Sequence, residues 1–147
     1  MKIDKATKND YDEIVRIWES SVKATHHFLK EEDFLLFKKM IPEKYLPEAN
    51  LYCISDENNI KHGFIGVSDD SLDMLFVDSD SMGKGYGKAL LKFALDELKI
   101  TKLDVNEQNE NAFGFYKKFG FEAISRSEKD SMGKDYPILH LEYKPKS

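Results

Sequence analysis

The sequence is poor in cysteine, lacks long apolar runs and carries no excess of basic residues. Its single cysteine, Cys53, cannot form an internal disulfide, and we expect it to be a small buried hydrophobic residue. No apolar run approaches the ~20 residues of a membrane-spanning helix, and the N-terminus lacks a signal-peptide pattern. These absences predict a cytoplasmic protein without a membrane partner.

The net charge of −5 argues against a general nucleic-acid surface, which needs an excess of basic residues. No cluster of histidine and cysteine has metal-ligand spacing, so we expect no metal. A hydrophobic content of 41% with 33% charged residues is typical of a folded globular chain. The length of 147 residues predicts one domain over residues 1–147, either as a monomer or as a homodimer.

Hydrophobic periodicity predicts an α/β (α+β) fold with a mixed sheet of about seven strands and about four helices. A helix is expected to begin at Asn9 or Asp10, and Pro42 and Pro47 are expected to end the second helix. Strands are predicted over 1–6, 50–56, 60–68, 71–78, 101–106, 121–128 and 136–143, and the later helices over 31–41, 89–98 and 109–119.

The most informative stretch is the glycine loop, Ser81-Met82-Gly83-Lys84-Gly85-Tyr86-Gly87-Lys88, between a strand-like and a helix-like run. Its glycines let the backbone approach a ligand closely. The helix that follows directs unpaired N–H groups and the positive end of its dipole to the same place. The combination is typical of a phosphate or pyrophosphate site. A mobile glycine turn without a ligand is the alternative reading.

Two common kinds of glycine loop are excluded by spacing. A P-loop needs Gly-x-x-x-x-Gly-Lys-Ser/Thr, but Met82 stands at the first glycine position and Ala89 at the hydroxyl position. A dinucleotide fingerprint needs Gly-x-Gly-x-x-Gly, and here the third glycine, Gly87, comes one residue early. ATP or NAD is therefore disfavoured as the ligand.

A second motif follows the glycine loop, and the two together resemble the GNAT superfamily of acetyl-CoA-dependent N-acetyltransferases over essentially the whole chain. The pyrophosphate motif of that family, Gln/Arg-x-x-Gly-x-Gly/Ala, matches Met82 to Gly87, with Met82 in place of the usual Gln or Arg. Its second motif, Asn-x-x-Ala followed by Tyr-x-x-x-Gly-Phe, is matched by Asn109, Ala112, Tyr116, Gly120 and Phe121.

The segments 18–29 and 104–109 are similar to a small bacterial branch of single-domain GNAT proteins, some of which are described as protein-lysine acetyltransferases. The resemblance implies a GNAT-like acyl-CoA N-acyltransferase fold, acetyl-CoA as co-substrate and an amine as acceptor. Small amines, antibiotics, amino acids and protein lysines or N-termini all stay open as that acceptor. A non-catalytic acyl-CoA-binding sensor or scaffold is the alternative function.

The resemblance also implies which residues contact the coenzyme. Backbone N–H groups of the glycine loop hold the pyrophosphate, and Lys84 or Lys88 can supply the positive charge that Met82 lacks. A backbone N–H of the strand before the loop polarises the thioester carbonyl. The expected coenzyme-binding residues are Leu75, Phe76, Val77, Met82, Gly83, Lys84, Gly85, Tyr86, Gly87, Lys88, Asn106, Asn109, Asn111 and Phe115.

Proton transfer needs an acid and a base. By resemblance, Tyr116 is the general acid at the coenzyme A sulfur, since a neutral phenol with a pKa of ~10 can donate to a thiolate. Asp73, the acidic residue inside the strand before the loop, is the first candidate for the base that deprotonates the amine. His26 or His27, in the break between the first two helices, is the rival, as base or as substrate contact.

Overall fold

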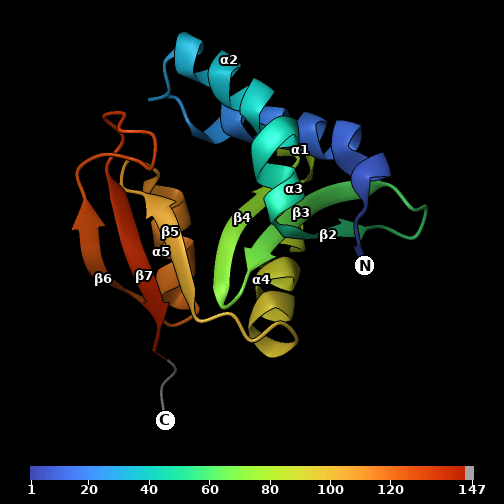
Figure 1. Ribbon diagram of the computed structural model, residues 1–147. Coiled ribbons are helices and arrows are strands. Elements are labelled where there is room, and N and C mark those ends of the chain that lie inside the picture. The colour runs from blue at the N-terminus through green and yellow to red at the C-terminus, as the bar shows by residue number, and fades with distance from the viewer. Residues whose placement is uncertain (145–147) are drawn as a thin grey trace. The chain divides into compact units, whose positions relative to one another are not determined.

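The structure, a computed structural model, describes residues 1–144 of the chain. These residues fall into two compact units, Met1–Ile100 and the part that begins at Thr101 (Figure 1). Together the described residues contain seven strands and four helices of at least nine residues, as the periodicity predicts. The single domain over residues 1–147 stays a prediction.

The first unit contains an antiparallel four-stranded sheet in the order β1-β2-β3-β4. The strands are β1 (Lys2–Lys5), β2 (Asn50–Ser55), β3 (Lys61–Ser68) and β4 (Ser71–Val77). The predicted hairpin between the second and third strands is confirmed, and the carboxylate of Asp56 closes its turn by accepting the N–H groups of Asn58 and Ile60.

Helices α1 (Tyr11–Thr25) and α4 (Tyr86–Asp96) cover opposite faces of this sheet (Figure 1). Phe64 of β3 is fully buried in the hydrophobic core that α1 shares with β2. A Cβ added at its neighbour Gly63 would instead lie 3.1 Å from Leu90 of α4. Because consecutive strand residues point to opposite faces, the two contacts place the two helices on the two sides of the sheet.

Helix α2 (Glu31–Met40) ends just before the two prolines, within one residue of its predicted end. The prediction that the prolines place the end of this helix is confirmed. A π-helical turn, Ile41–Tyr45, and the short α3 (Leu46–Glu48) follow it and were not predicted. Each proline is the second residue of one of these short segments, a position where the missing N–H is tolerated.

The second unit contains a three-stranded antiparallel sheet in the order β5-β7-β6, with α5 packed on it. The elements are β5 (Lys102–Asn106), α5 (Glu110–Lys118), β6 (Phe121–Ser127) and β7 (Ile138–Tyr143). Strand β7 begins two residues later than predicted. The N–H of Tyr136 is engaged in a turn with the carbonyl of Lys134, and Pro137 has no N–H to give to a ladder.

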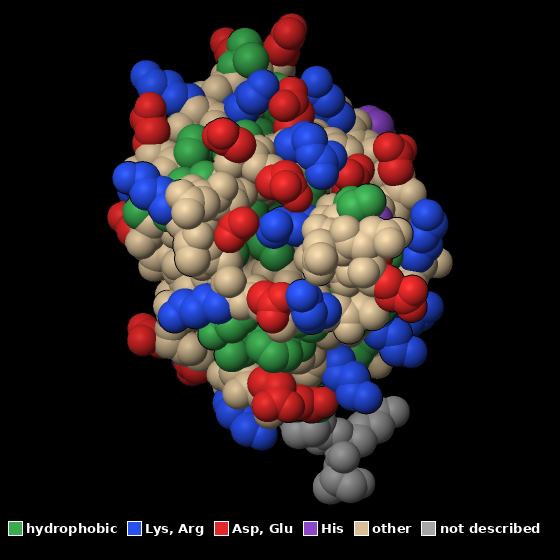
Figure 2. Space-filling view, turned by 90° about the vertical axis from the view of Figure 1, so that its right-hand side faces the viewer, with side chains coloured by type: hydrophobic (Ala, Val, Ile, Leu, Met, Phe, Trp, Pro, Cys, Tyr) green, Lys and Arg blue, Asp and Glu red, His purple; other side chains and the backbone are tan. Residues whose placement is uncertain are grey.

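Charged side chains of both signs are interspersed on the face of the molecule in Figure 2, with apolar patches between them. The expectation of no nucleic-acid partner stays a prediction. Among the described residues, no helix is both long and apolar enough to cross a membrane.

Candidate functional site

Two glycines of the glycine loop have backbone angles that few other residues adopt. Gly83 and Gly85 have φ angles of 80° and 90°, in the left-handed region that glycine favours. A Cβ added at Gly83 would meet no atom within 4 Å, so the backbone angle rather than crowding within the chain calls for glycine there. Met82 is 40% exposed and Lys84 is also exposed, so this stretch of backbone is open to a ligand.

Helix α4 begins three residues earlier than predicted, and the end of the glycine loop forms its first turn. Gly85 is the N-cap residue, and within the described chain no side chain caps this helix. The first N–H groups of α4 are therefore available to an anion. Lys88 is exposed in the same turn and adds a positive charge. The arrangement fits a pyrophosphate.

Strand β4 contains the residues whose backbone N–H is expected to polarise the thioester carbonyl. Leu75, Phe76 and Val77 pair with Ile65, Phe64 and Gly63 of β3 in antiparallel register. Every second residue of such a strand turns its N–H away from its partner strand. At least one residue between Leu75 and Val77 thus directs its N–H away from β3.

Asp73 lies at a β-bulge. Gly66 pairs with Met74 and Val67 pairs with Leu72, so Asp73 is the extra residue of β4. A bulge bends the strand and redirects its side chain. The exposed carboxylate of Asp73 accepts a hydrogen bond of 2.5 Å from the Ser68 hydroxyl. An exposed carboxylate can accept a proton, as the predicted role requires.

The two histidines after α1 have different surroundings. His26 packs against Phe76 of β4, with ring centroids 6.4 Å apart, and its Nδ1 lies 2.7 Å from the Thr25 hydroxyl. Burial lowers the pKa of His26 to about 4, helped by the nearby His27. Its ring is partly buried against Phe76 and is therefore less accessible to an incoming amine. His27 is exposed and has no such burial, which makes it the better of the two candidates.

A cavity of about 400 Å³ lies between α1 and α2 and includes both histidines in its lining. Its lining combines apolar side chains with charged ones. Glu19 forms ion pairs with Lys38 and Lys23, each at 3.1 Å, and these two lysines lower its pKa. The residues that line the cavity are Glu19, Val22, Lys23, His26, His27, Leu29, Glu31, Phe34, Leu35 and Lys38.

In the second unit, Asn109 and Gly120 bound α5 as predicted. The side-chain oxygen of Asn109 accepts the N–H of Ala112 at 3.3 Å, which makes Asn109 the N-cap residue. Gly120 follows the C-cap with a φ of 104°. Tyr116 is 8% exposed between Phe115 and Phe121, and burial raises the pKa of its phenol. The phenol is therefore uncharged near pH 7.

The other coenzyme candidates of this unit lie around the start of α5. Asn106 ends β5, and its side-chain oxygen accepts the N–H of Gln108 at 2.9 Å. Asn111 is exposed in the first turn of the helix, and the ring of Phe115 contacts Tyr116 edge-on and Phe119 at a tilt. The structure thus groups the predicted residues within each unit: the loop, β4 and His26 in the first, and 106–116 in the second.

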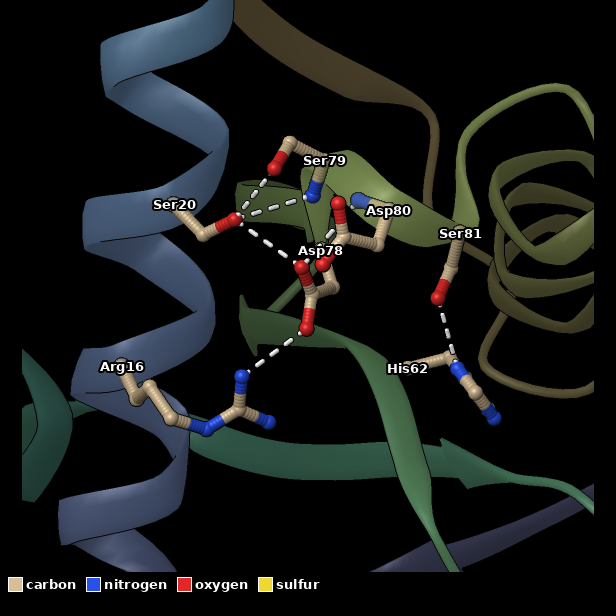
Figure 3. A network of polar contacts seen from close by, with 7 residues as sticks. All are labelled: Arg16, Ser20, His62, Asp78, Ser79, Asp80 and Ser81. Atoms are coloured by element: carbon tan, nitrogen blue, oxygen red, sulfur yellow. Dashed lines mark hydrogen bonds and ion pairs between the residues drawn. The ribbon is translucent and has the colours of Figure 1, made fainter.

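Sequence reasoning missed a polar network that fixes the start of the glycine loop (Figure 3). Asp78, directly after β4, accepts hydrogen bonds of 2.9 Å from both Arg16 and Ser20 of α1. The Ser20 hydroxyl oxygen accepts the N–H of Ser79 at 3.0 Å. Partial burial opposes the ionisation of Asp78, but the hydrogen bonds outweigh it and its pKa is lowered. The partners are about sixty residues apart in the chain, and no local pattern signals them.

Comparisons with known proteins agree with this geometry. Residues 19–136 match the family model of the acetyltransferase (GNAT) domain. The chain is 41% identical over 143 residues to the peptidyl-lysine N-acetyltransferase YjaB of Escherichia coli K12, which covers 97% of each chain.

Solved structures of N-acetyltransferases have the same fold as this chain. The solution structure of apo-form YjaB from Escherichia coli superposes with a TM-score of 0.90 at 40% identity, over 99% of this chain and 98% of that one. The PaiA N-acetyltransferase of Thermoplasma acidophilum, solved in complex with coenzyme A, has a TM-score of 0.74 at 22% identity and covers 97% and 98% of the two chains. The predicted fold class is confirmed, and the chain belongs to the GNAT acetyltransferase family.

Proposed function

We propose that this chain transfers the acetyl group of acetyl-CoA to the side-chain amine of lysine in peptides or proteins. Acetyl transfer from acetyl-CoA to an amine is the activity of its family and of its relatives. The observation that carries the proposal is the glycine loop, where two left-handed glycines precede a helix whose N-terminus no described side chain caps. The choice of lysine as acceptor rests on the resemblance to YjaB, a peptidyl-lysine N-acetyltransferase.

The coenzyme would be held by the chain's backbone more than by its side chains. The N–H groups from Gly83 to Lys88 face the pyrophosphate, and Lys84 and Lys88 balance part of its charge. An N–H between Leu75 and Val77 stabilises the carbonyl oxygen as negative charge develops on it. Acetyl-CoA itself supplies the activated acyl group.

The acceptor would bind in the cavity between α1 and α2. A lysine side chain combines an apolar stem with a cationic end. Val22, Phe34 and Leu35 offer the cavity's apolar surface, and Glu31 and Glu19 offer carboxylates. Glu19 is already paired with two lysines, so Glu31 is the carboxylate we assign to the incoming ammonium.

Two residues would move the protons. Tyr116, whose phenol burial keeps protonated, donates that proton to the departing thiolate, and water then returns a proton to the phenolate. Asp73 accepts the proton that the ammonium must lose, from the position where the bulge redirects its side chain. His27 is the rival base.

The proposal is tested by incubating the protein with acetyl-CoA and a peptide that has one lysine and a free N-terminus. We expect an acetyl group on the lysine Nζ by fragment-ion mass spectrometry. Tyr116→Phe should lower kcat about a hundredfold with little change in acetyl-CoA affinity. Tyr136→Phe, which alters another buried tyrosine of the same unit, is the matched control.

The base is identified by the pH dependence of kcat/KM. If Asp73 is the base, Asp73→Asn lowers kcat/KM and changes its pH profile, whereas His27→Gln leaves both unchanged. The reverse result assigns the role to His27. Acetylation of the N-terminal amine alone would contradict the lysine assignment. Coenzyme binding without transfer to any amine would favour an acyl-CoA sensor.

We also expect the protein to act in the bacterial cytoplasm.

A further inference from the structure

One imidazole contacts both ends of the exposed part of the glycine loop. His62 of β3 places its Nδ1 2.6 Å from the hydroxyl oxygen of Ser81, the residue before Met82 (Figure 3). Its ring stacks on Tyr86, the first residue of α4, with centroids 4.5 Å apart and planes 15° apart. The two contacts bracket residues 82–85, which contain both left-handed glycines.

The other side of the ring is fixed as well. Nε2 of His62 lies 2.7 Å from a carboxylate oxygen of Asp56, in the turn between β2 and β3. The other oxygen of Asp56 accepts backbone N–H groups, and the hydrogen bond from His62 is the main cause of the lowered pKa of this carboxyl. An ionised carboxylate requires a donor, so Nε2 carries a hydrogen. In the neutral ring, Nδ1 then accepts the proton of the Ser81 hydroxyl.

The two residues that His62 contacts are buried, whereas the loop between them is exposed. Ser81 and Tyr86 are 4% and 9% exposed, whereas Met82 between them is 40% exposed. The carbonyl of His62 also accepts the N–H of Asp78 at 2.8 Å, which fixes the chain just before the loop. The backbone between the two ends is open to a ligand while both ends are held.

We propose that His62 is a positioning residue that holds the glycine loop in the conformation that binds acetyl-CoA, an inference that rests on the proposed function. Glycine residues lose more conformational entropy on ordering than any others. A loop that is already ordered avoids that loss when the ligand binds. An ordered loop matters more here because Met82 stands where the family has Gln or Arg, so backbone N–H groups must make most of the contacts with the pyrophosphate.

The test measures the Kd of acetyl-CoA by titration calorimetry, together with KM and kcat. His62→Ala removes the hydrogen bond to Ser81 and the ring stack on Tyr86. We expect Kd and KM for acetyl-CoA to rise about tenfold, the effect of losing one hydrogen bond and one ring stack. At saturating acetyl-CoA, kcat should stay within about twofold, because the variant acts on binding. His140→Ala is the matched control, since His140 also bonds an aspartate and a serine, Asp104 and Ser127, at 2.7 Å each.

Two conservative variants distinguish a role in positioning the glycine loop from a role in stabilising the hairpin turn at Asp56. The amide of His62→Asn reaches the position of Nδ1 and can keep the bond to Ser81, whereas that of His62→Gln reaches the position of Nε2 and can keep the bond to Asp56. The proposal predicts that Asn restores acetyl-CoA affinity better than Gln. A role limited to the hairpin turn predicts the opposite order and would overturn the proposal.

The binding measurements distinguish failure of the proposed function from failure of the positioning role of His62. If the unaltered protein does not bind acetyl-CoA, the proposed function fails. If it binds while His62→Ala and Ser81→Ala bind within about twofold of it, only the positioning role is wrong. Should His62→Ala fail to fold, Ser81→Ala decides alone, because it removes one hydroxyl group and leaves the ring in place.

Discussion

Replacing Gly83 by alanine tests the glycine loop with little steric disturbance. Gly83 has a φ of 80°, and an added Cβ would meet no atom within 4 Å. The expected effect therefore comes from the backbone, since a non-glycine residue in the left-handed region loses about 1–2 kcal/mol. For a chain of this size, that loss lowers the thermal midpoint by about 3–6 °C.

The same change should weaken acetyl-CoA binding by more than it weakens folding. If the alanine moves to a negative φ, the N–H groups around it turn away from the pyrophosphate. Loss of one charge-assisted hydrogen bond is worth about 1.5–3 kcal/mol, which corresponds to about a tenfold to hundredfold rise in Kd. Titration calorimetry gives the Kd, and scanning calorimetry gives the thermal midpoint.

Gly114 is the matched control. An added Cβ there also meets nothing within 4 Å, but Gly114 lies inside α5, where alanine is favoured. Gly114→Ala should raise the free energy of unfolding by about 0.5–1 kcal/mol and leave the Kd unchanged. The reasoning is refuted if Gly83→Ala binds acetyl-CoA as tightly as the unaltered protein and melts at the same temperature.

Three further predictions concern the first unit. Phe64 is fully buried, so Phe64→Ala should lower the free energy of unfolding by about 3–5 kcal/mol in urea titrations, and a loss below about 1 kcal/mol would contradict its place in the core. Burial raises the pKa of Cys53 to about 12, so its thiol should stay unreactive toward a disulfide reagent at pH 8 until the protein unfolds; immediate labelling of the folded chain would contradict this. Burial lowers the pKa of His26 to about 4 from 6.5, so the unfolded chain takes up this proton first and stability should fall as the pH drops from 6.5 toward 4. The denaturation midpoint of His26→Gln should depend less on pH over that window, and an equal dependence would contradict the assignment.

Local chemistry allowed several features of the glycine loop and of α5 to be predicted. The glycines indicated a backbone that a ligand can approach closely, and Gly83 and Gly85 are both exposed. Asn109 and Gly120 bound α5 because an Asn side chain and a glycine satisfy the ends of a helix. Each feature depends on neighbours in the sequence, which is why a short motif indicates it.

Features that depend on distant residues could not be predicted in this way. The bulge at Asp73 arises from the register between β3 and β4, and His62 reaches Ser81 across nineteen positions of the sequence. The segment after α2 shows a different limit. The prolines correctly place the end of that helix, but they do not exclude the two short helical segments that follow, in which each proline is the second residue.

The central claim is that the chain acetylates an amine with acetyl-CoA held at the glycine loop. The most direct test measures the release of coenzyme A thiol from acetyl-CoA with a lysine-containing peptide whose N-terminus is blocked, and with the same blocked peptide carrying arginine in place of lysine. The account predicts release that requires the lysine and that falls about a hundredfold in Tyr116→Phe. Equal release with both peptides, or no release while acetyl-CoA binds, would contradict it.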